Sequence, residues 1–288
     1  MKVIRTLTQM QSVSRRLRQQ GRRIGFVPTM GYLHAGHLSL VQGARQECDA
    51  VVVSIYVNPR QFGPQEDFER YPRDLQRDLT LLKPCGVDYV FVPQDRQMYP
   101  AGFETVVDVP RLAAGLCGRT RPGHFQGVGT VVTKLFSIVQ PDRAYFGQKD
   151  AQQAAIIQRL AADLNFSTLI RVLPTKREPD GLAMSSRNIY LNAKHRQQAT
   201  ALYRALRLAQ ERMRAGERSG SRLKQVMQRL IDKYPAVRID YIDIVDARTL
   251  APKAMLAGEV LIALAAYIGR VRLIDNARVR VHYKENAL

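Results

Sequence analysis

The stretch from Pro28 to Leu40, with the sequence PTMGYLHAGHLSL, places the strongest constraint on how this chain can fold. It follows a short apolar run at 24–27 and leads into a segment in which apolar residues recur at helical spacing. Those apolar residues are Leu38, Val41, Ala44 and Cys48. The pattern predicts a buried strand, then a tight loop, then a helix.

A helix that begins directly after a buried strand is a favourable site for phosphate. Its first turn carries unpaired backbone N–H groups and the positive end of the helix dipole. Gly31 and Gly36 allow the backbone to approach a ligand closely, and His34 and His37 place two imidazoles on one side of the turn. Imidazoles so placed can donate hydrogen bonds to phosphoryl oxygens as negative charge develops.

The tetrapeptide HAGH alone leaves two other interpretations of these histidines open. The pair could bind a metal, although it lacks the i, i+4 spacing and the intervening glutamate of a zinc-protease helix, and no third ligand stands out. It could also be a pair of surface histidines, because short motifs often match by chance. The sequence around the motif has to decide between these interpretations.

Apolar strand patterns alternate with amphipathic helix patterns around the motif, up to about residue 173. We expect a first helix that is capped by Thr8 and ended by Gly21. Strands are expected at 24–27, 50–57, 87–92, 143–146 and 168–173, and further helices at 74–82, 127–139 and 151–163. This alternation predicts an α/β fold, a Rossmann-like doubly wound parallel sheet.

The pattern changes after about residue 176. Two amphipathic helices are expected at about 194–214 and 221–234, followed by alternating strands at 237–245, 260–268 and 271–281. Short turns between these strands favour an antiparallel arrangement. We therefore predict two domains: a Rossmann-like domain over 1–176 and a smaller α+β domain over 177–288.

Polar groups suited to a nucleotide gather in loops at the carboxyl ends of the expected strands, where open α/β sheets bind ligands. Besides the two imidazoles, these loops hold Lys149, Ser185, Ser186 and Arg187. Nucleotidyl transfer needs cationic donors around the phosphates and little covalent chemistry from the protein. Taken singly, each residue could be an ordinary surface residue. The sequence has no Walker A motif, which disfavours a P-loop kinase.

Composition narrows the class of protein further. The chain has 288 residues, 45% of them hydrophobic, which is enough for a substantial core. Its three cysteines form no C-x-x-C pair, which argues for a reducing compartment and against a structural zinc. The N-terminus has no apolar signal core, and no apolar run approaches the roughly 20 residues of a membrane helix. We therefore expect a soluble cytoplasmic protein.

The net charge of +19 raises the alternative of a nucleic-acid-binding module. The basic residues concentrate in two separate helical segments, at 15–23 and 204–218, with few aromatic residues between them. This distribution favours solvated helix faces, so no specific nucleic-acid partner is expected. The charge can still help to attract ATP.

Several strings of the sequence together resemble one enzyme family. The H-x-G-H at the strand-to-helix turn resembles the signature of the nucleotidylyltransferase superfamily. The longer string P-T-M-G-x-L-H-x-G-H-L-S-L resembles that of the pantothenate synthetase family, and further matching strings run along nearly the whole chain. They are VNPRQFGP, EDFERYPRD, RPGHF-x-GV, PDRAYFGQKDAQQ, REPDGLAMSSRNIYL and RLIDN.

The resemblance implies an ATP-dependent ligase that joins pantoate to β-alanine and releases AMP and pyrophosphate by way of pantoyl adenylate, with ATP and pantoate bound by the domain over 1–176. It implies that the domain over 1–176 is catalytic and that the domain over 177–288 is lid-like. It also implies catalytic roles for His34, His37, Lys149 and Arg187. It implies that ATP is bound by Met30, Gly31, Tyr32, Leu33, His34, Ala35, Gly36, His37, Gly147, Gln148, Lys149, Asp150, Lys176, Met184, Ser185, Ser186 and Arg187. Pantoate or β-alanine would be held by Met30, Asn58, Gln61 and Gln153.

The resemblance also implies a homodimer and Mg²⁺, which would be carried mainly by the phosphates of ATP. Asp78 is our candidate for an outer metal contact, although Arg77 beside it replaces a commonly acidic residue. Lys176 stands where the family usually has an apolar residue against adenine. The alternative activity is nucleotidyl transfer to a phosphorylated acceptor. Gln61 and Gln153 disfavour it, because amides suit a neutral hydroxy acid better than a phosphate.

Overall fold

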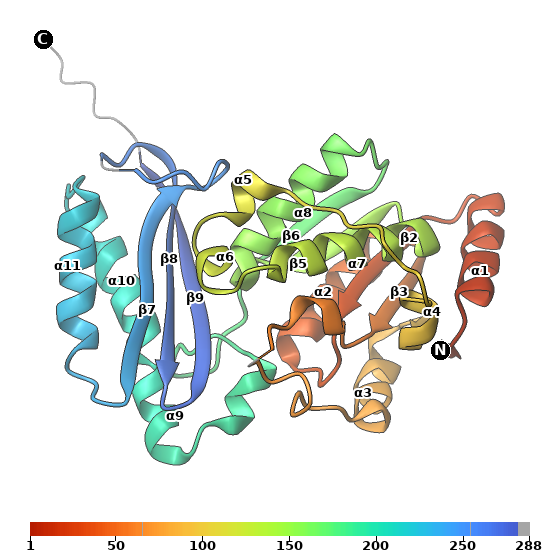
Figure 1. Ribbon diagram of the computed structural model, residues 1–288, viewed down its shortest axis with the longest axis horizontal. Helices are drawn as coiled ribbons and strands as arrows, with labels where there is room; N and C mark the ends of the chain where they lie inside the picture. Colours follow the sequence, from red (N-terminus) through yellow and green to blue (C-terminus); the bar gives the residue numbers. More distant parts are fainter. Residues whose placement is uncertain (65, 254, 282–288) are drawn as a thin grey trace, which may run out of the picture. The chain divides into compact units, whose positions relative to one another are not determined.

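The computed structural model describes residues 1–64, 66–253 and 255–281. These residues form two compact units, shown in Figure 1. The first unit contains residues 1–113, 121–148 and 153–176, and the second contains 114–120, 149–152 and the described part of 177–288. The assignment of a catalytic role to 1–176 and of a lid-like role to 177–288 stays a prediction.

The first unit is built on a six-stranded parallel sheet with the order β1-β4-β3-β2-β5-β6. The strands are β1 (Lys2–Ile4), β2 (Ile24–Thr29), β3 (Ala50–Ile55), β4 (Tyr89–Phe91), β5 (Arg143–Gly147) and β6 (Leu169–Leu173). This sheet confirms the predicted Rossmann-like α/β fold. Strand β1 was not predicted, because three residues are too few to show a period of two.

Helices cover both faces of this sheet. Neighbouring residues of a strand point to opposite faces, so two adjacent residues of β2 contact two different helices. On β2, Phe26 packs edge-on against Phe136 of helix α7 (His124–Val139), with ring centroids 6.5 Å apart. The next residue, Val27, packs in a buried cluster with Val41 of helix α2 (Ala35–Glu47). The other helices that begin in this unit before α7 are α1 (Leu7–Gln19), α3 (Leu75–Leu82), α4 (Asp95–Met98) and α5 (Pro110–Ala113).

The first helix begins one residue before Thr8, so the prediction that Thr8 caps it is wrong. Thr6 is the N-cap, and its hydroxyl oxygen accepts a hydrogen bond from the backbone N–H of Gln9 at 3.3 Å. Both threonines precede the apolar stripe, and either could supply a capping oxygen. The apolar spacing alone could not separate them.

The pairing of β2 with β5 marks a switch point in the strand order of the sheet. These two strands pair at Gly25–Arg143 and Phe26–Ala144, near their amino ends, and the pairing does not extend to their carboxyl ends. The chain leaves β2 towards β3 on one side, and β5 lies on the other side. Such a switch point is where open α/β sheets bind ligands, at the carboxyl ends of the strands.

Glu47, the last residue of α2, ties this helix to strands β5 and β6. Its carboxylate accepts hydrogen bonds from Arg171 at 2.5 Å, from Arg143 at 2.7 Å and from the Tyr145 hydroxyl at 3.0 Å. The hydrogen bond from Arg171, helped by those from Tyr145 and Arg143 and opposed by burial, lowers the pKa of Glu47 from 4.5 to about 2. The helix that carries HAGH is therefore anchored at its far end by a charged contact.

We expect the stability of the protein to depend on the charge of Glu47 in acid. A depressed pKa adds stability above the unfolded value of 4.5, and this stability is lost as the pH falls towards 2. Urea unfolding at a series of acid pH values should therefore show a shallower loss of unfolding free energy for Glu47→Gln than for the parent chain. Parallel curves for the two proteins would contradict the assignment.

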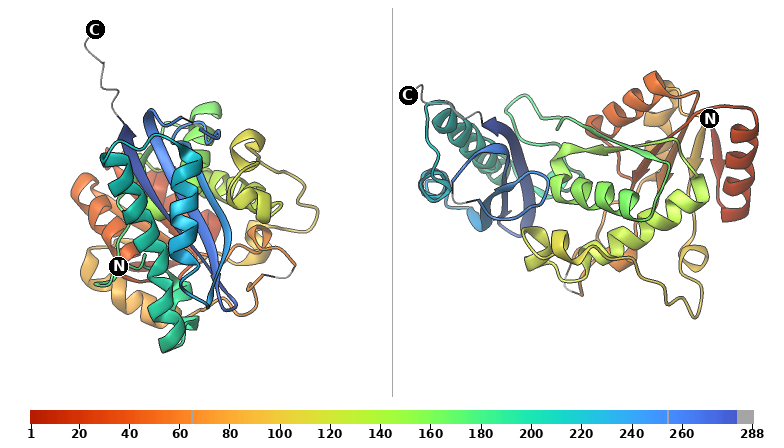
Figure 2. Two further views of the ribbon diagram at one scale, coloured as in Figure 1. Left: turned by 90° about the vertical axis from the view of Figure 1, so that its left-hand side faces the viewer. Right: turned by 90° about the horizontal axis from the view of Figure 1, so that it is seen from above.

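The second unit is built on an antiparallel sheet of β7 (Val237–Asp246), β8 (Gly258–Ile268) and β9 (Val271–Val281). Helices α10 (Ala201–Arg214) and α11 (Gly220–Ile231) lie on one face of this sheet, as Figures 1 and 2 show. Alternate residues of β8, from Val260 to Ile268, fill the core between them. The predicted α+β character of this part is confirmed.

The helix expected at 194–214 is in fact two helices, so that boundary was wrong. Helix α9 (Ala193–Ala199) ends at Thr200, and α10 begins with Ala201. The Thr200 hydroxyl donates a hydrogen bond to the carbonyl of Gln197 at 2.7 Å. A threonine that bonds back to the preceding turn competes with the backbone pattern of a helix.

The cysteines add no cross-link to the described part of either unit. All three are free, and Cys48 and Cys117 are buried. Within residues 1–64, 66–253 and 255–281, no helix is both long enough and apolar enough to cross a lipid bilayer.

Candidate functional site

The turn between β2 and α2 is fixed by a buried carboxylate. Gly31 has a φ of +82° and Tyr32 a φ of +48°, both in the left-handed region. The two oxygens of Asp78 accept the backbone N–H groups of Tyr32 at 2.8 Å and of Leu33 at 2.7 Å. A Cβ on Gly31 would lie 3.0 Å from Ile55, so glycine suits both the space and the backbone conformation.

These contacts give Asp78 a role in shaping the turn. Its side chain is 1% exposed, and Arg77 approaches one of its oxygens at 3.4 Å. Burial raises the pKa of Asp78 above its usual value, against the two backbone hydrogen bonds. No group of three or more histidine, cysteine, aspartate or glutamate side chains in the described part of the chain could hold a metal ion. The outer metal contact expected of Asp78 stays a prediction.

His34 and His37 interlock at the amino end of α2. His34 is the N-cap residue, and its Nδ1 accepts the backbone N–H of Gly36 at 3.1 Å. In return, Nδ1 of His37 accepts the backbone N–H of His34 at 3.3 Å. The two rings lie with their centroids 4.1 Å apart. This is a capping box in which imidazoles replace the usual hydroxyl and carboxylate.

The capping box also determines which ring nitrogens carry hydrogen. A nitrogen that accepts a backbone N–H is unprotonated, so Nδ1 of both histidines lacks a hydrogen. A neutral imidazole then carries its hydrogen on Nε2. Nε2 is therefore the nitrogen through which each neutral ring can donate a hydrogen bond.

Gln61 is oriented by a chain of hydrogen bonds that starts at Tyr99. Burial raises the pKa of Tyr99 to about 12, so at neutral pH its hydroxyl donates to Oδ1 of Asn58, at 2.8 Å. Nδ2 of Asn58 then donates to Oε1 of Gln61 at 3.1 Å. This leaves Nε2 of Gln61 directed towards the sulfur of Met30, at 3.1 Å. The amide of Gln61 therefore presents N–H donors on the side of Met30.

Helix α7 packs directly against the short 3-10 helix that carries Gln61, η1 (Pro59–Gln61). A Cβ on Gly127 would lie 2.2 Å from the carbonyl oxygen of Arg60, so only glycine permits this approach. The approach lets Nδ2 of Asn58 donate a second hydrogen bond to the carbonyl of Gly127, at 3.1 Å.

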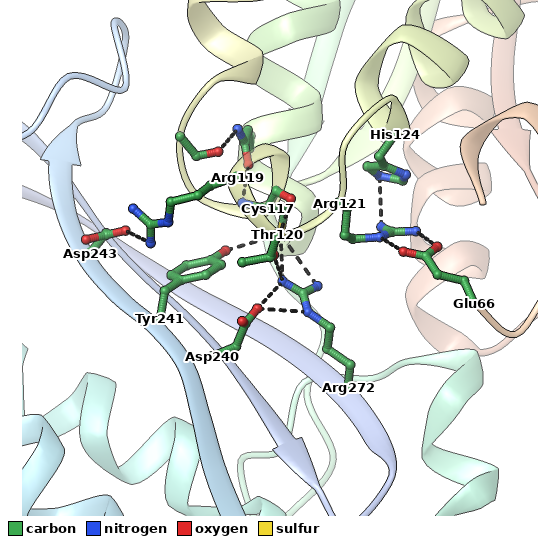
Figure 3. A network of polar contacts seen from close by, with 12 residues as sticks. Glu66, Cys117, Arg119, Thr120, Arg121, His124, Asp240, Tyr241, Asp243 and Arg272 are labelled. Atoms are coloured by element: carbon green, nitrogen blue, oxygen red, sulfur yellow. Dashed lines mark hydrogen bonds and ion pairs between the residues drawn. The ribbon is translucent and has the colours of Figure 1, made fainter. Parts of the chain in front are cut away.

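Arg121 and His124 hold the backbone of Gln61. Figure 3 shows the contact between these two residues and the ion pair of Arg121 with Glu66. Nδ1 of His124 donates to the carbonyl of Gln61 at 2.8 Å, and Arg121 donates to the same oxygen at 3.3 Å. Arg121 also binds both oxygens of Glu66, at 2.5 and 2.6 Å. Burial opposes ionisation of Glu66, but these bonds from Arg121 lower its pKa overall.

Sequence reasoning missed the roles of Tyr99, Arg121 and His124. The string RPGHF contains the latter two, and its glycine and basic residues marked a loop, but nothing in the string indicates that it holds Gln61. Tyr99 lies 41 positions from Asn58 in the sequence and belongs to no matched string. Only the fold brings them together.

A cavity of about 400 Å³ borders the turn after β2. Its wall includes Met30, Gly31 and Tyr32 from the turn, Tyr56 after β3, and Asp78. This volume is in the range of small-molecule sites. Met30 lies in the wall of this cavity, and its sulfur is also the atom that Nε2 of Gln61 contacts.

The two cations with a predicted catalytic role, Lys149 and Arg187, both lie in the second unit. Lys149 lies in the 3-10 helix η3 (Gln148–Asp150), its side chain is 21% exposed, and its Nζ is 3.5 Å from Asp150. Ser185 caps the 3-10 helix η4 (Ser186–Tyr190), where its hydroxyl accepts the backbone N–H of Arg187 at 3.2 Å. Ser186 is buried. Each of the two segments is therefore a short helical turn that presents a cationic side chain.

Residues 114–120 join the second unit through the network in Figure 3. Arg272 on β9 binds Asp240 at 2.8 Å, donates to the hydroxyl of Thr120 at 3.2 Å and lies 3.6 Å from the sulfur of Cys117. Cys117 also contacts the hydroxyl of Tyr241 at 3.2 Å. The chain passes into the first unit at the next residue, Arg121.

The other predicted site residues are spread over both units. In the first unit, Gly147 ends β5, Gln148 follows it, Gln153 lies on helix α8 (Ala151–Asp163), and Lys176 is exposed. Ala35 and Gly36 form the first turn of α2. In the second unit, Asp150 ends η3 and Met184 directly precedes Ser185.

Comparisons with known proteins agree with this arrangement. A family model described as pantoate-beta-alanine ligase matches residues 2–278. Pantothenate synthetase from Heliobacterium modesticaldum is 56% identical over 281 residues, which are 98% of this chain and all of that protein. Pantothenate synthetase from Thermotoga petrophila is 53% identical over 276 residues, which are 96% of this chain and 99% of that protein.

Solved structures give the same result. The crystal structure of pantothenate synthetase from Thermus thermophilus has a TM-score of 0.93 and 46% identity, and the match covers 97% of this chain and all of that one. Pantoate-beta-alanine ligase from Francisella tularensis, in a complex with beta-gamma ATP and beta-alanine, has a TM-score of 0.79 and 37% identity, with 96% and 97% covered. The chain belongs to the pantoate-beta-alanine ligase family.

Proposed function

We propose that the chain is an ATP-dependent ligase that condenses pantoate with β-alanine to give pantothenate, AMP and pyrophosphate. The observation that carries the proposal is the pair of interlocked histidines at the switch point of the sheet, in which Nδ1 of each ring accepts a backbone N–H. Membership of the pantoate-beta-alanine ligase family supports the choice of substrates.

The first step is adenylate formation. A carboxylate oxygen of pantoate attacks the α-phosphorus of ATP, and the bond from that phosphorus to the bridging oxygen breaks, so pyrophosphate leaves with the electron pair. His34 and His37 donate Nε2–H groups to phosphoryl oxygens. Lys149 and Arg187 neutralise the charge of the triphosphate, and the hydroxyls of Ser185 and Ser186 add hydrogen bonds to it. No nucleophile from the protein is required.

The second step is amide formation. The amine of β-alanine attacks the acyl carbon of pantoyl adenylate, the bond to the phosphate oxygen breaks, AMP leaves and the nitrogen loses a proton. Gln61 is oriented as a hydrogen-bond donor, so it is suited to hold an oxygen of pantoate or the carboxylate of β-alanine. Gln153 and Met30 complete this pocket in the proposal.

Three further features belong to the proposal. Mg²⁺ would be held mainly by phosphate oxygens, because this cation keeps substrate and water ligands and needs few protein carboxylates. The active protein would be a homodimer, and it would work in the cytoplasm. The homodimer and Mg²⁺ follow from the family resemblance, and the cytoplasmic location follows from the cysteine usage, which favours a reducing compartment.

The test is a product assay with ATP, Mg²⁺ and pantoate, with and without β-alanine, that follows pyrophosphate exchange and AMP separately. We expect pantoate-dependent exchange of labelled pyrophosphate into ATP, and sustained AMP release only after β-alanine is added. Absence of exchange with pantoate would reject the ligase. Exchange that instead requires a phosphorylated acceptor, with a stable adenylylated product, would support the alternative transferase.

The orientation of Gln61 gives a prediction for Tyr99. Tyr99→Phe removes the donor to Asn58, and a hydrogen bond of this kind contributes about 0.5–1.5 kcal/mol. We expect the KM for pantoate to rise roughly threefold to tenfold while the KM for ATP stays close to that of the parent. Tyr89→Phe is the matched control, because the hydroxyl of Tyr89 accepts a hydrogen bond from the exposed Arg16 of α1, at 3.2 Å. Equal effects of both variants would contradict the orientation chain.

A further inference from the structure

The string RLIDN, residues 272–276, has no role in the steps above, yet it lies in the amino-terminal half of β9 in the second unit. Its last two residues, Asp275 and Asn276, are 3% and 5% exposed. A buried aspartate and a buried asparagine side by side need specific partners to compensate for the loss of water. The partners of both lead to segments that carry proposed ATP-binding residues.

Asn276 holds the segment that contains Lys149. Its Nδ2 donates to the backbone carbonyl of Lys149 at 2.8 Å, inside the second unit. Its own backbone N–H donates to Oδ1 of Asp275 at 2.8 Å. Since the carbonyl of Lys149 is part of the short 3-10 helix η3, this hydrogen bond fixes the backbone from which the lysine side chain extends.

Asp275 holds the turn that leads to Ser185 and Arg187. Both of its oxygens are bound by the guanidinium of Arg177, at 2.6 and 2.9 Å. Arg177 also donates to the carbonyl of Gly181 at 3.1 Å, and its backbone pairs with that of Ala183. Burial raises the pKa of Asp275, and the hydrogen bonds from Arg177 oppose this rise.

The turn is held closely around these groups. The guanidinium of Arg177 stacks over the ring of Tyr203 at 4.6 Å, and a Cβ on Gly181 would lie 2.0 Å from that ring. The turn therefore has little freedom between β9 and helix α10. Ser185 follows only two residues after Ala183, so the position of the Ser185–Arg187 segment depends on this anchor.

We propose that Asp275 and Asn276 are positioning residues that hold the Lys149 segment and the Ser185–Arg187 segment in one fixed arrangement for a nucleoside triphosphate. The inference rests on the proposed function, because it takes these two segments to be the ones that contact phosphate. Neither residue needs to touch the nucleotide itself. Two adjacent residues of one strand would then set the distance between an ammonium and a guanidinium.

The experiment compares Asn276→Ala with the parent chain and with Arg280→Ala. Arg280 lies on the same strand, is exposed and forms a long ion pair with Glu259, at 3.7 Å, so it controls for a change on β9 alone. Calorimetry with ATP measures nucleotide binding directly, without any reaction. We expect Asn276→Ala to weaken ATP binding roughly threefold to tenfold and to raise the KM for ATP equally, with an unchanged KM for pantoate.

A purely structural role would lower Tm and the active fraction but would leave ATP affinity unchanged, and that outcome would overturn the proposal. If Asn276→Ala does not fold, Asn276→Ser is the second variant. Serine keeps a polar group at this buried position, but its shorter side chain does not place a donor where Nδ2 of Asn276 meets the carbonyl of Lys149. The calorimetric arm is separate from the ligase assay. If the parent chain binds ATP but shows no pantoate-dependent exchange, the proposed function is rejected. The calorimetric comparison of Asn276→Ala with the parent chain would still test the positioning role.

Discussion

Replacing Lys149 with alanine is expected to lower kcat/KM for adenylate formation about 10²-fold, which corresponds to about 2.7 kcal/mol of transition-state stabilisation. The side chain of Lys149 is mostly covered, with 21% of it exposed, and the carbonyl of the same residue is fixed by Asn276. A cation held in a fixed position can stabilise charge on phosphoryl oxygens without reorganising during the reaction.

The measurement is pantoate-dependent pyrophosphate exchange at saturating pantoate. Lys194→Ala is the matched control, because Lys194 is an exposed lysine of helix α9 in the same unit. The Tm of Lys149→Ala should match that of the parent, because the contact of the ammonium with Asp150 is long, at 3.5 Å. Near-parental exchange by Lys149→Ala would remove this residue from the mechanism.

The sequence contained most of the information that defines the fold. The β-branched run at 50–57 and the helical spacing after HAGH helped to predict alternating strands and helices, and from them the parallel sheet. Local patterns failed where they were too short or ambiguous. Strand β1 has three residues, and Thr6 and Thr8 are equally good capping residues in sequence. The break at Thr200 depends on which carbonyl its hydroxyl contacts.

The predicted site could be drawn from sequence as a set of chemical groups, but not as a set of orientations. Two histidines three residues apart predict imidazoles at a helix terminus, and the capping box then shows which nitrogens donate. A glutamine can present either its oxygen or its nitrogen. The hydroxyl of Tyr99, through Asn58, decides between them for Gln61, and a contact between residues 41 positions apart has no periodic signal.

The sequence and the structure suggest different roles for Asp78. In the sequence it is an acidic residue near a proposed nucleotide site, which suggests a metal. In the structure it is a buried acceptor for two consecutive backbone N–H groups of the turn that precedes His34. Backbone N–H groups of the turn compensate the charge of Asp78. The helix dipole of α2 acts only from Ala35 onward, after the turn that Asp78 holds.

We therefore expect Asp78→Ala to lower the free energy of unfolding by about 2–4 kcal/mol, since hydrogen bonds to a charged group contribute about 1.5–3 kcal/mol each. The loss falls below the sum of two such bonds, because burial already opposes the charge and raises the pKa of Asp78. Urea unfolding at neutral pH measures the change. Asp163→Ala is the control, because Asp163 is exposed and pairs with Arg159, which is exposed as well.

The same variant should lose activity beyond its loss of stability. Without Asp78, the N–H groups of Tyr32 and Leu33 lack their acceptor, and Tyr32 has no reason to keep its positive φ. The N-cap conformation of His34 follows that turn directly, so the Nε2–H donors lose their alignment. Pyrophosphate exchange measured well below the Tm of the variant separates the two effects. Full exchange activity in a destabilised but folded Asp78→Ala would show that the capping box of His34 and His37 orients itself without the buried carboxylate.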